Sequence, residues 1–293
     1  MKIVVLGASG VVGRALLPLL AEHEVVAVSR RPPERSRVGA RWVAADITER
    51  EELDGLFDGA DVVYHLVHSL GAKDFAHRDR RAADAVAEAS ESAGVRQIVF
   101  LGGLGDASDG SSLHLRSRAE TAERLASQSV PVTTLRSAIV VGEGSAAFET
   151  IVALVDRLPV MVCPRWVRTR TQPIALGDVV RYLSGVAGRS EALGRAFDVA
   201  GPEVMTCRDM IERVGDLRGR RPRIVEVPVL TPRLSSLWLH LVTPVQAGVA
   251  RELVDGLRTE TVARENDIAE LVPFEPTPFE EAARTALPER DAA

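Results

Sequence analysis

The sequence predicts an α/β protein built on a doubly wound parallel sheet, and two observations support this prediction. First, an apolar run at residues 3–6 leads into three glycines, Gly7-x-x-Gly10-x-x-Gly13, and then into a helix-like segment at 11–21. Second, apolar, β-branched runs alternate with helical segments at regular spacing up to about residue 142. Such runs are typical of strands covered by helices on both faces, and right-handed crossovers make the sheet doubly wound.

The expected elements follow one another in a regular order. We expect strands at 3–6, 24–28, 41–45, 61–67, 96–101 and 132–135, and helices at 11–21, 49–57, 74–93 and 112–127. Beyond residue 142 the pattern loosens into a helix ending at Arg157, an extended basic segment at 164–173, a helix near Leu176 and a strand at 196–199. A helix capped by Thr206 and Asp209, a strand at 223–227 and two apolar helical segments at 234–257 complete the chain.

Length and composition suit a globular protein with a large core. The chain has 293 residues, and 46% of them are hydrophobic. We expect a Rossmann-type core at 1–155 and a smaller, mainly helical C-terminal substrate lobe at 156–288. The lobe is expected to interleave with the core in one compact unit, followed by a frayed tail at 289–293.

Charge and composition exclude several classes of function. A net charge of −5 and an aromatic content of 4% argue against nucleic-acid binding. We expect no signal peptide, and no stretch approaches the roughly 20 apolar residues of a membrane span. Cys163 and Cys207 form no metal-type cluster, and no metal site is expected. We expect a cytoplasmic monomer or homodimer that acts on a small molecule without stable membrane insertion.

The glycine turn at the N-terminus predicts a dinucleotide site. Gly7 can take the sharp turn, Gly10 lets the backbone approach a pyrophosphate, and Gly13 lets helix and strand pack closely. The helix N-terminus then offers free amides and a partial positive charge. A glycine-rich turn that holds no ligand is the alternative, but the position between a strand and a helix favours a nucleotide.

The end of the second strand favours NADP(H) over NAD(H). An acidic residue at this position would bind the ribose 2′-hydroxyl of NAD, whereas arginine accommodates the 2′-phosphate of NADP. The chain has Ser29-Arg30-Arg31 there. Arginine suits bidentate phosphate contacts, although a solvated basic loop would have the same sequence.

The chain resembles an atypical member of the short-chain dehydrogenase/reductase superfamily, close to the NmrA-like and complex I NAD(P)-binding-subunit-like groups. The resemblance rests on the glycine turn, on Asp46-Ile47, on the phrase from Val95 to Gly103, and on later phrases at 135–142, 172–174 and 177–179. It implies that Asp46 and Ile47 contact adenine, and that Val67, His68, Gly102 and Gly103 line the nicotinamide side.

One departure from this family pattern bears on the chemistry. Typical members use Tyr-x-x-x-Lys on the helix after the fifth strand, but no such spacing occurs in this chain. The matching positions hold His114 and Arg118, and Gly102-Gly103 replaces the usual serine. His114 can act as a general acid, whereas Arg118 can hold a ribose or phosphate but cannot shuttle protons near neutral pH. His68, just past the fourth strand, is the rival acid; for both histidines a purely structural role is the alternative.

The candidate residues fall into two groups. The predicted catalytic residues are His114, Arg118 and His68. The predicted cofactor-binding residues are Gly7, Ser9, Gly10, Val11, Val12, Gly13, Ser29, Arg30, Arg31, Asp46, Ile47, Val67, His68, Gly102, Gly103, Arg118 and Ile139.

Three functions are compatible with these residues. The first is an NADPH-dependent reductase of a small, largely apolar carbonyl or conjugated-alkene substrate. The second is a non-catalytic NADP(H)-binding redox sensor or regulatory protein, motivated by the missing tyrosine and lysine. The third is a non-redox isomerase or cyclase that keeps the nucleotide as a scaffold.

Overall fold

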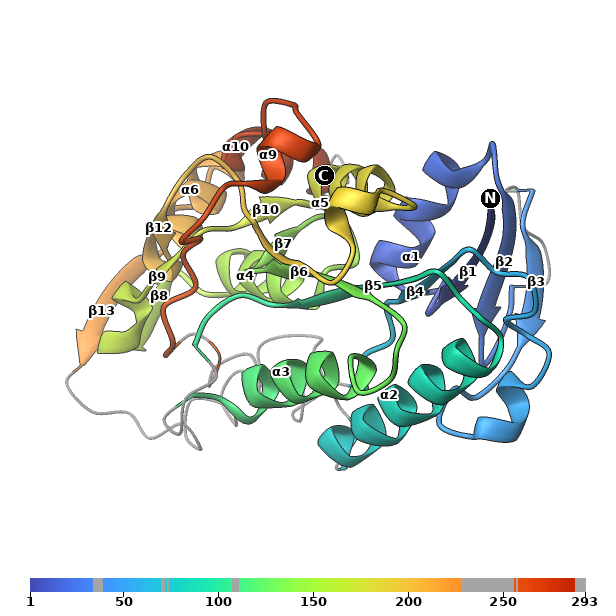
Figure 1. Cartoon of the computed structure of the whole chain (residues 1–293). Coiled ribbons are helices and arrows are strands. Elements are labelled where there is room, and N and C mark those ends of the chain that lie inside the picture. Colours follow the sequence, from blue (N-terminus) through green and yellow to red (C-terminus); the bar gives the residue numbers. More distant parts are fainter. Residues whose placement is uncertain are drawn as a thin grey trace.

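A seven-stranded parallel sheet forms the centre of the molecule (Figure 1). The computed structural model describes residues 1–33, 39–69, 72, 74–106, 111–227, 256 and 258–287. The strand order is β11-β6-β5-β4-β1-β2-β3. Successive strands are added on one side of β1 up to β3 and on the other side from β4 onward, as in the Rossmann fold. The predicted fold class is therefore confirmed. The strands are β1 Lys2–Leu6, β2 Glu24–Ser29, β3 Arg41–Ala44, β4 Val62–His65, β5 Gln97–Gly103, β6 Val132–Ser137 and β11 Ala196–Val199.

Helices cover both faces of the sheet (Figure 1). On one face lie α1, Val11–Leu16, which continues as a 3-10 turn at Leu17–Leu20, and α5, Leu176–Val186. On the other lie α2, Phe75–Ser92, and α3, Leu113–Leu125. Because both faces are covered, β1, β2 and β4 carry runs of apolar residues instead of a strict alternation of apolar and polar ones.

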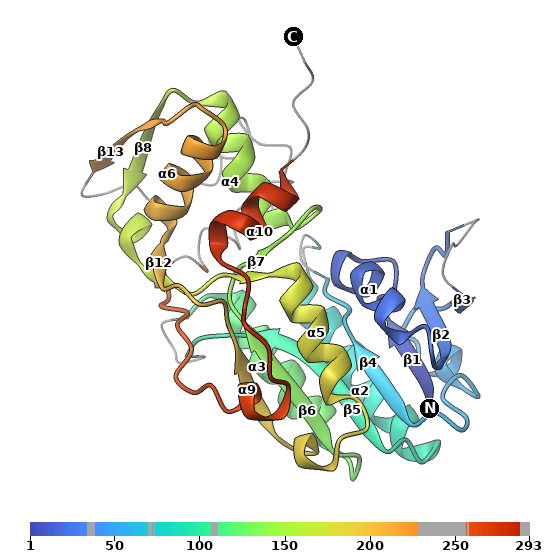
Figure 2. The same cartoon turned by 90° about the horizontal axis from the view of Figure 1, so that it is seen from above.

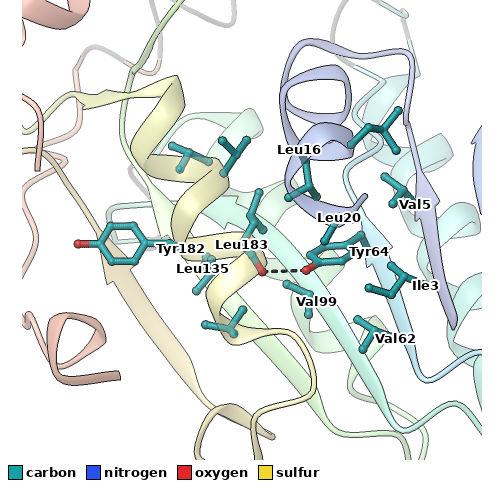
Figure 3. Packing of buried hydrophobic residues seen from close by; sticks show 14 of the residues in the cluster. Ile3, Val5, Leu16, Leu20, Val62, Tyr64, Val99, Leu135, Tyr182 and Leu183 are labelled. Atoms are coloured by element: carbon teal, nitrogen blue, oxygen red, sulfur yellow. Dashed lines mark hydrogen bonds between the residues drawn. The ribbon is translucent and has the colours of Figure 1, made fainter. Parts of the chain in front are cut away.

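The core on the α1 and α5 face shows why the strands carry large apolar residues (Figure 3). Ile3 and Val5 of β1 point toward Leu16 of α1, while Tyr64 of β4 lies fully buried beside them. The hydroxyl of Tyr64 donates a hydrogen bond to the carbonyl of Leu183 in α5, at 2.8 Å. A buried tyrosine needs such a partner, and this bond ties α5 to the centre of the sheet.

A smaller C-terminal region packs beyond the β6 and β11 side of the sheet (Figure 2). Its core joins the helices α4, Ala146–Arg157, α6, Cys207–Leu217, and α10, Phe279–Ala286; a short helix, α9, Ile268–Leu271, packs against α5 and β11 instead. Three two-stranded sheets join them: β7 Val140–Val141 with β10 Ile174–Ala175, β8 Val160–Pro164 with β13 Arg223–Val227, and β9 Arg170–Thr171 with β12 Met205–Thr206. The predicted capping box is present, with Thr206 and Asp209 bonding reciprocally.

The structure corrects two predicted elements. The helix expected at 49–57 is only a 3-10 turn, Arg50–Leu53. The Thr48 hydroxyl donates to the Asp46 carboxylate instead of capping a helix, and Gly55 adopts a φ of +70°, which ends helical geometry. The extended segment expected at 164–173 contains a second 3-10 turn, Arg165–Arg168.

Some predictions fall outside the described residues. These are the tail at 289–293 and the two apolar helical segments at 234–257, of which only Gly256 is described. Within the part of the chain that the structure describes, no helix has the length and apolar character required to cross a bilayer.

Candidate cofactor and catalytic site

The glycine turn has the geometry of a pyrophosphate cradle. Gly7 adopts a φ of +83°, and a Cβ on it would lie 3.0 Å from the carbonyl carbon of Leu66. A Cβ on Gly13 would lie 2.4 Å from the carbonyl oxygen of Gly7, so only glycine lets α1 approach β1 this closely. The amides of Val11, Val12 and Gly13 belong to the first helical turn, where no intrahelical carbonyl can accept them. The residues present therefore fit a dinucleotide.

The predicted adenosine side lies at the ends of β2 and β3. The hydroxyls of Ser9 and Ser29 lie 2.7 Å apart, and the amide of Arg31 donates to Ser29 Oγ at 3.3 Å. The pair therefore links the glycine turn to the arginine-bearing loop, whose residues Arg30 and Arg31 are exposed.

Asp46 follows β3 at the same edge, with Ile47 buried next to it. Burial alone would raise the pKa of Asp46, but hydrogen bonds from Thr48 and the positive charges of Arg78 and Arg30 hold that pKa below its ordinary value.

The predicted nicotinamide side lies where β4 and β5 end. Gly102 and Gly103 are the last residues of β5, not the loop that follows it. A Cβ on Gly103 would lie 3.0 Å from Leu115 Cδ2 of α3. The apolar side chain of Leu115 therefore lies against the position at which typical family members carry a serine.

Arg118 is a buried cation beneath this edge. It donates from Nη1 to the carbonyl of Val67 at 3.3 Å and from Nη2 to the carbonyl of Leu101. Its guanidinium also stacks 4.5 Å from the ring centre of Phe100. Burial lowers the pKa of Arg118 to about 10, so it remains charged at neutral pH. Its hydrogen bonds join the ends of β4 and β5.

The two candidate acids lie side by side. The rings of His68 and His114 are 4.8 Å apart, although one follows β4 and the other begins α3. His114 is partly buried, and its Nδ1 finds no hydrogen-bond partner among the described residues. Burial lowers the pKa of His114 to about 3, and the neighbouring charges of His68 and Arg118 act in the same direction.

The structure adds Asp79 to this cluster, a residue that is not among the predicted site residues. Asp79 Oδ2 lies 3.3 Å from His68 Nδ1, and Oδ1 accepts the amide of Ser69 at 3.0 Å. Asp79 lies on the buried stripe of α2, between Phe75 and Ala82. An acid within an otherwise apolar stripe was the available signal, because a charge is buried only where it is paired.

Ile139 follows β6 and completes the predicted set. Its carbonyl accepts the amide of Ile174 at 3.0 Å, which opens the β7 and β10 pair. Further along this segment, a Cβ on Gly144 would lie 3.1 Å from Val11 Cγ2 at the start of α1. The segment after β6 therefore passes beside the glycine turn.

Comparison with known proteins agrees with this geometry. Residues 7–139 match a family described as NAD(P)H-binding. An uncharacterised protein of Mycobacterium tuberculosis is 38% identical over 102 residues, a match that spans 34% of this chain but only 12% of that protein. The (4-alkanoyl-5-oxo-2,5-dihydrofuran-3-yl)methyl phosphate reductase of Streptomyces griseus is 29% identical over 238 residues, covering 78% of this chain and 77% of the reductase. An Arabidopsis thaliana mitochondrial NADH dehydrogenase subunit, alpha subcomplex subunit 9, is 22% identical over 76% of this chain and 60% of its own length.

Solved structures share the fold at low identity. Triphenylmethane reductase of a Citrobacter species, complexed with NADP(H), superposes with a TM-score of 0.78 at 17% identity, covering 98% of this chain and 100% of that one. An Escherichia coli NADPH-dependent quinone oxidoreductase, complexed with NADPH, gives a TM-score of 0.76 at 18% identity, with coverage of 97% and 98%.

The fold and the glycine cradle define a dinucleotide-binding protein of the Rossmann class. More particularly, residues 7–139 match the NAD(P)H-binding family, in agreement with the resemblance that the sequence motifs indicated.

Proposed function

We propose that this protein is an NADPH-dependent reductase of a small, largely apolar carbonyl or conjugated-alkene compound. The observation that carries the proposal is the cluster of His68, His114 and Asp79 at the nicotinamide edge, where the family's tyrosine and lysine are absent. Such a cluster can supply the proton that a reduction consumes. Distant relatives with reductase activity support the same reaction class.

The preference for NADP(H) rests on charge. Arg30 and Arg31 are exposed at the end of β2, where an NAD-specific protein would place an acid. Arg78 Nη2 lies 3.8 Å from Asp46 Oδ2, so a third arginine borders the same edge. Guanidinium groups at this position suit a 2′-phosphate.

The preference for an apolar substrate rests on the groups beside the predicted nicotinamide. Leu104 and Leu115 are buried there, and Gly103 offers no hydroxyl. Such surroundings exclude water and leave the histidines as the polar groups that orient a substrate oxygen.

The division of labour follows from these positions. When bound, the nicotinamide supplies a hydride, that is, two electrons and one hydrogen. The glycine turn holds the pyrophosphate, Arg30 and Arg31 hold the 2′-phosphate, and an imidazole of the cluster delivers the proton. The product therefore gains two hydrogens, one from the cofactor and one from the protein.

A panel of aldehydes, ketones, quinones and enones tests the proposal. The loss of absorbance of reduced nicotinamide should require both protein and substrate and should be faster with NADPH than with NADH. Tight NADPH binding without turnover of any compound would contradict the proposal.

That same outcome would favour a non-catalytic NADP(H) sensor, the alternative that the missing tyrosine and lysine motivate. Capture of a partner from the host that changes between NADP⁺ and NADPH supports the sensor. Capture that ignores the nucleotide contradicts it.

A further inference from the structure

We propose that Asp79 is a positioning residue that fixes one tautomer of His68 and thereby makes His68, rather than His114, the proton donor of the site. This inference rests on the proposed reductase function and extends it to the identity of the acid and of the group that orients it.

The carboxylate of Asp79 has a fixed orientation. Its side chain is 2% exposed, and both oxygens are engaged, Oδ1 by the amide of Ser69 and Oδ2 by His68 Nδ1. The Ser69 amide belongs to the segment that follows β4, whereas Asp79 belongs to α2. The contact therefore holds the nicotinamide edge against the helix behind it.

The chemistry of the pair determines the tautomer. An ionised carboxylate only accepts hydrogen bonds, so His68 Nδ1 must carry the hydrogen. Burial would raise the pKa of Asp79, but the hydrogen bonds from His68 and Ser69 and the charge of Arg118 lower it, which keeps the carboxylate ionised. His68 Nε2 is then the ring nitrogen that can gain and lose a proton.

Asp79 also separates the two histidines electrostatically. Titratable groups from three elements surround His68. Helix α2 contributes Asp79, α3 contributes His114 and Arg118, and β4 contributes His65. Burial and then Arg118 lower the pKa of His68, while the hydrogen bond and charge of Asp79 act to raise it. Among the described residues, His114 donates no hydrogen bond to a carboxylate, and burial lowers its pKa to about 3. The hydrogen bond to Asp79 therefore favours protonation of His68, and His114 lacks this contribution.

Access favours the same residue. The His68 side chain remains 27% exposed, so the ring is accessible to a ligand at the edge of the sheet. In the proposed step the Nε2–H bond breaks, and its proton forms the new O–H or C–H bond of the reduced product. The imidazole is left neutral and is reprotonated from solvent, so the protein undergoes no net change.

The first test is the tautomer of His68 in the unmodified protein, read from two-bond proton–nitrogen NMR couplings of the imidazole. We expect Nδ1 to be protonated in the neutral ring, without any cofactor present. A neutral His68 protonated at Nε2 instead would overturn the proposal, whether or not the protein proves to be a reductase.

The second test is Asp79→Asn. The asparagine oxygen can still accept the Ser69 amide, which turns the NH₂ group toward His68 Nδ1 and forces the Nε2–H tautomer. We expect the His68 pKa to fall and kcat to drop about 100-fold with little change in KM, within the range for loss of general-acid catalysis. In the unmodified enzyme kcat should rise as pH falls toward the His68 pKa, and the variant should lose this dependence.

Asp84→Asn is the matched control, because Asp84 lies on the same helix but is 44% exposed and pairs with Arg124 at 2.8 Å. It should leave the His68 tautomer, the pH profile and kcat unchanged. An Asp79→Asn protein with an unaltered tautomer and pH profile would refute the positioning role while leaving the reductase intact. The expected tautomer in a protein that reduces nothing would instead refute the reductase.

Discussion

At the scale of single residues, buried histidines make stability depend on pH. His65 is 1% exposed, and its Nδ1 has no hydrogen-bond partner within the described ranges. Burial lowers the pKa of His65 to about 3. Below pH ~6.5 the unfolded chain binds a proton at this residue and the folded chain does not, so stability is complete above that pH and declines as pH falls toward 3.

The substitution His65→Leu should therefore reduce the acid sensitivity of folding. Between pH ~6.5 and ~5 we expect the free energy of unfolding to fall less in the variant, by on the order of 1–2 kcal/mol. Urea titrations at several pH values measure this difference. The exposed His77, changed to Gln, is the control. Parallel pH curves for His65→Leu and the unmodified protein would show that His65 is not responsible.

Also at the residue scale, Arg30 and Arg31 should set cofactor preference. In Arg30→Ala/Arg31→Ala the affinity for NADPH should fall by about 10-fold or more, because each charge-assisted bond to a phosphate is worth about 1.5–3 kcal/mol. Affinity for NADH should change far less. Calorimetric titration of both cofactors measures the two losses, with Arg96→Ala, a largely exposed arginine at the opposite end of the sheet, as control. Equal losses would contradict the 2′-phosphate assignment.

At the scale of secondary-structure elements, the packing of α1 on β1 should tolerate no side chain at Gly13. In Gly13→Ala the added Cβ would meet the Gly7 carbonyl oxygen at 2.4 Å and the Ala8 Cα at 2.7 Å. We expect a loss of about 1–3 kcal/mol of stability and a strong loss of nucleotide binding, since the cradle must move. Thermal unfolding with and without NADPH measures both.

Gly177→Ala is the matched control for that substitution. Gly177 lies in the first turn of α5, and a Cβ on it would meet nothing within 4 Å. Alanine is the better helix former, so this variant should be as stable as the original or slightly more so. A Gly13→Ala protein that matches it in stability and binding would contradict the role given to the turn.

The elements also show which features the sequence could predict. The strands and the helices α2, α3 and α5 lie close to their expected ranges because apolar periodicity and caps such as Ser112 act locally. The prediction of a helix at 49–57 was wrong because Thr48 bonds to Asp46 and Gly55 breaks the turn. These local interactions compete with helix formation, and apolar periodicity does not reveal them. The role of Asp79 could not be predicted from the sequence, because it depends on how α2 packs against the end of β4.

At the scale of the whole molecule, the order of the sheet assembles the site. Parallel strands place the ends of β1, β2, β4 and β5 at one edge, so the glycine turn, Arg30, His68 and Gly102 lie along the same edge of the sheet. This much followed from the predicted fold. The contact of His68 with His114 did not, because it depends on how α3 lies against β5, which tertiary packing decides.

The most direct test of the account is the fate of the hydride. A substrate found in the panel would be incubated with NADPH that carries deuterium at both hydrogen positions of nicotinamide C4, and the product analysed by NMR. We predict one deuterium at a single carbon of the product and one solvent-derived hydrogen on the neighbouring atom. A product without deuterium would show that the hydride of the nicotinamide does not reach the substrate and would contradict the proposed hydride transfer.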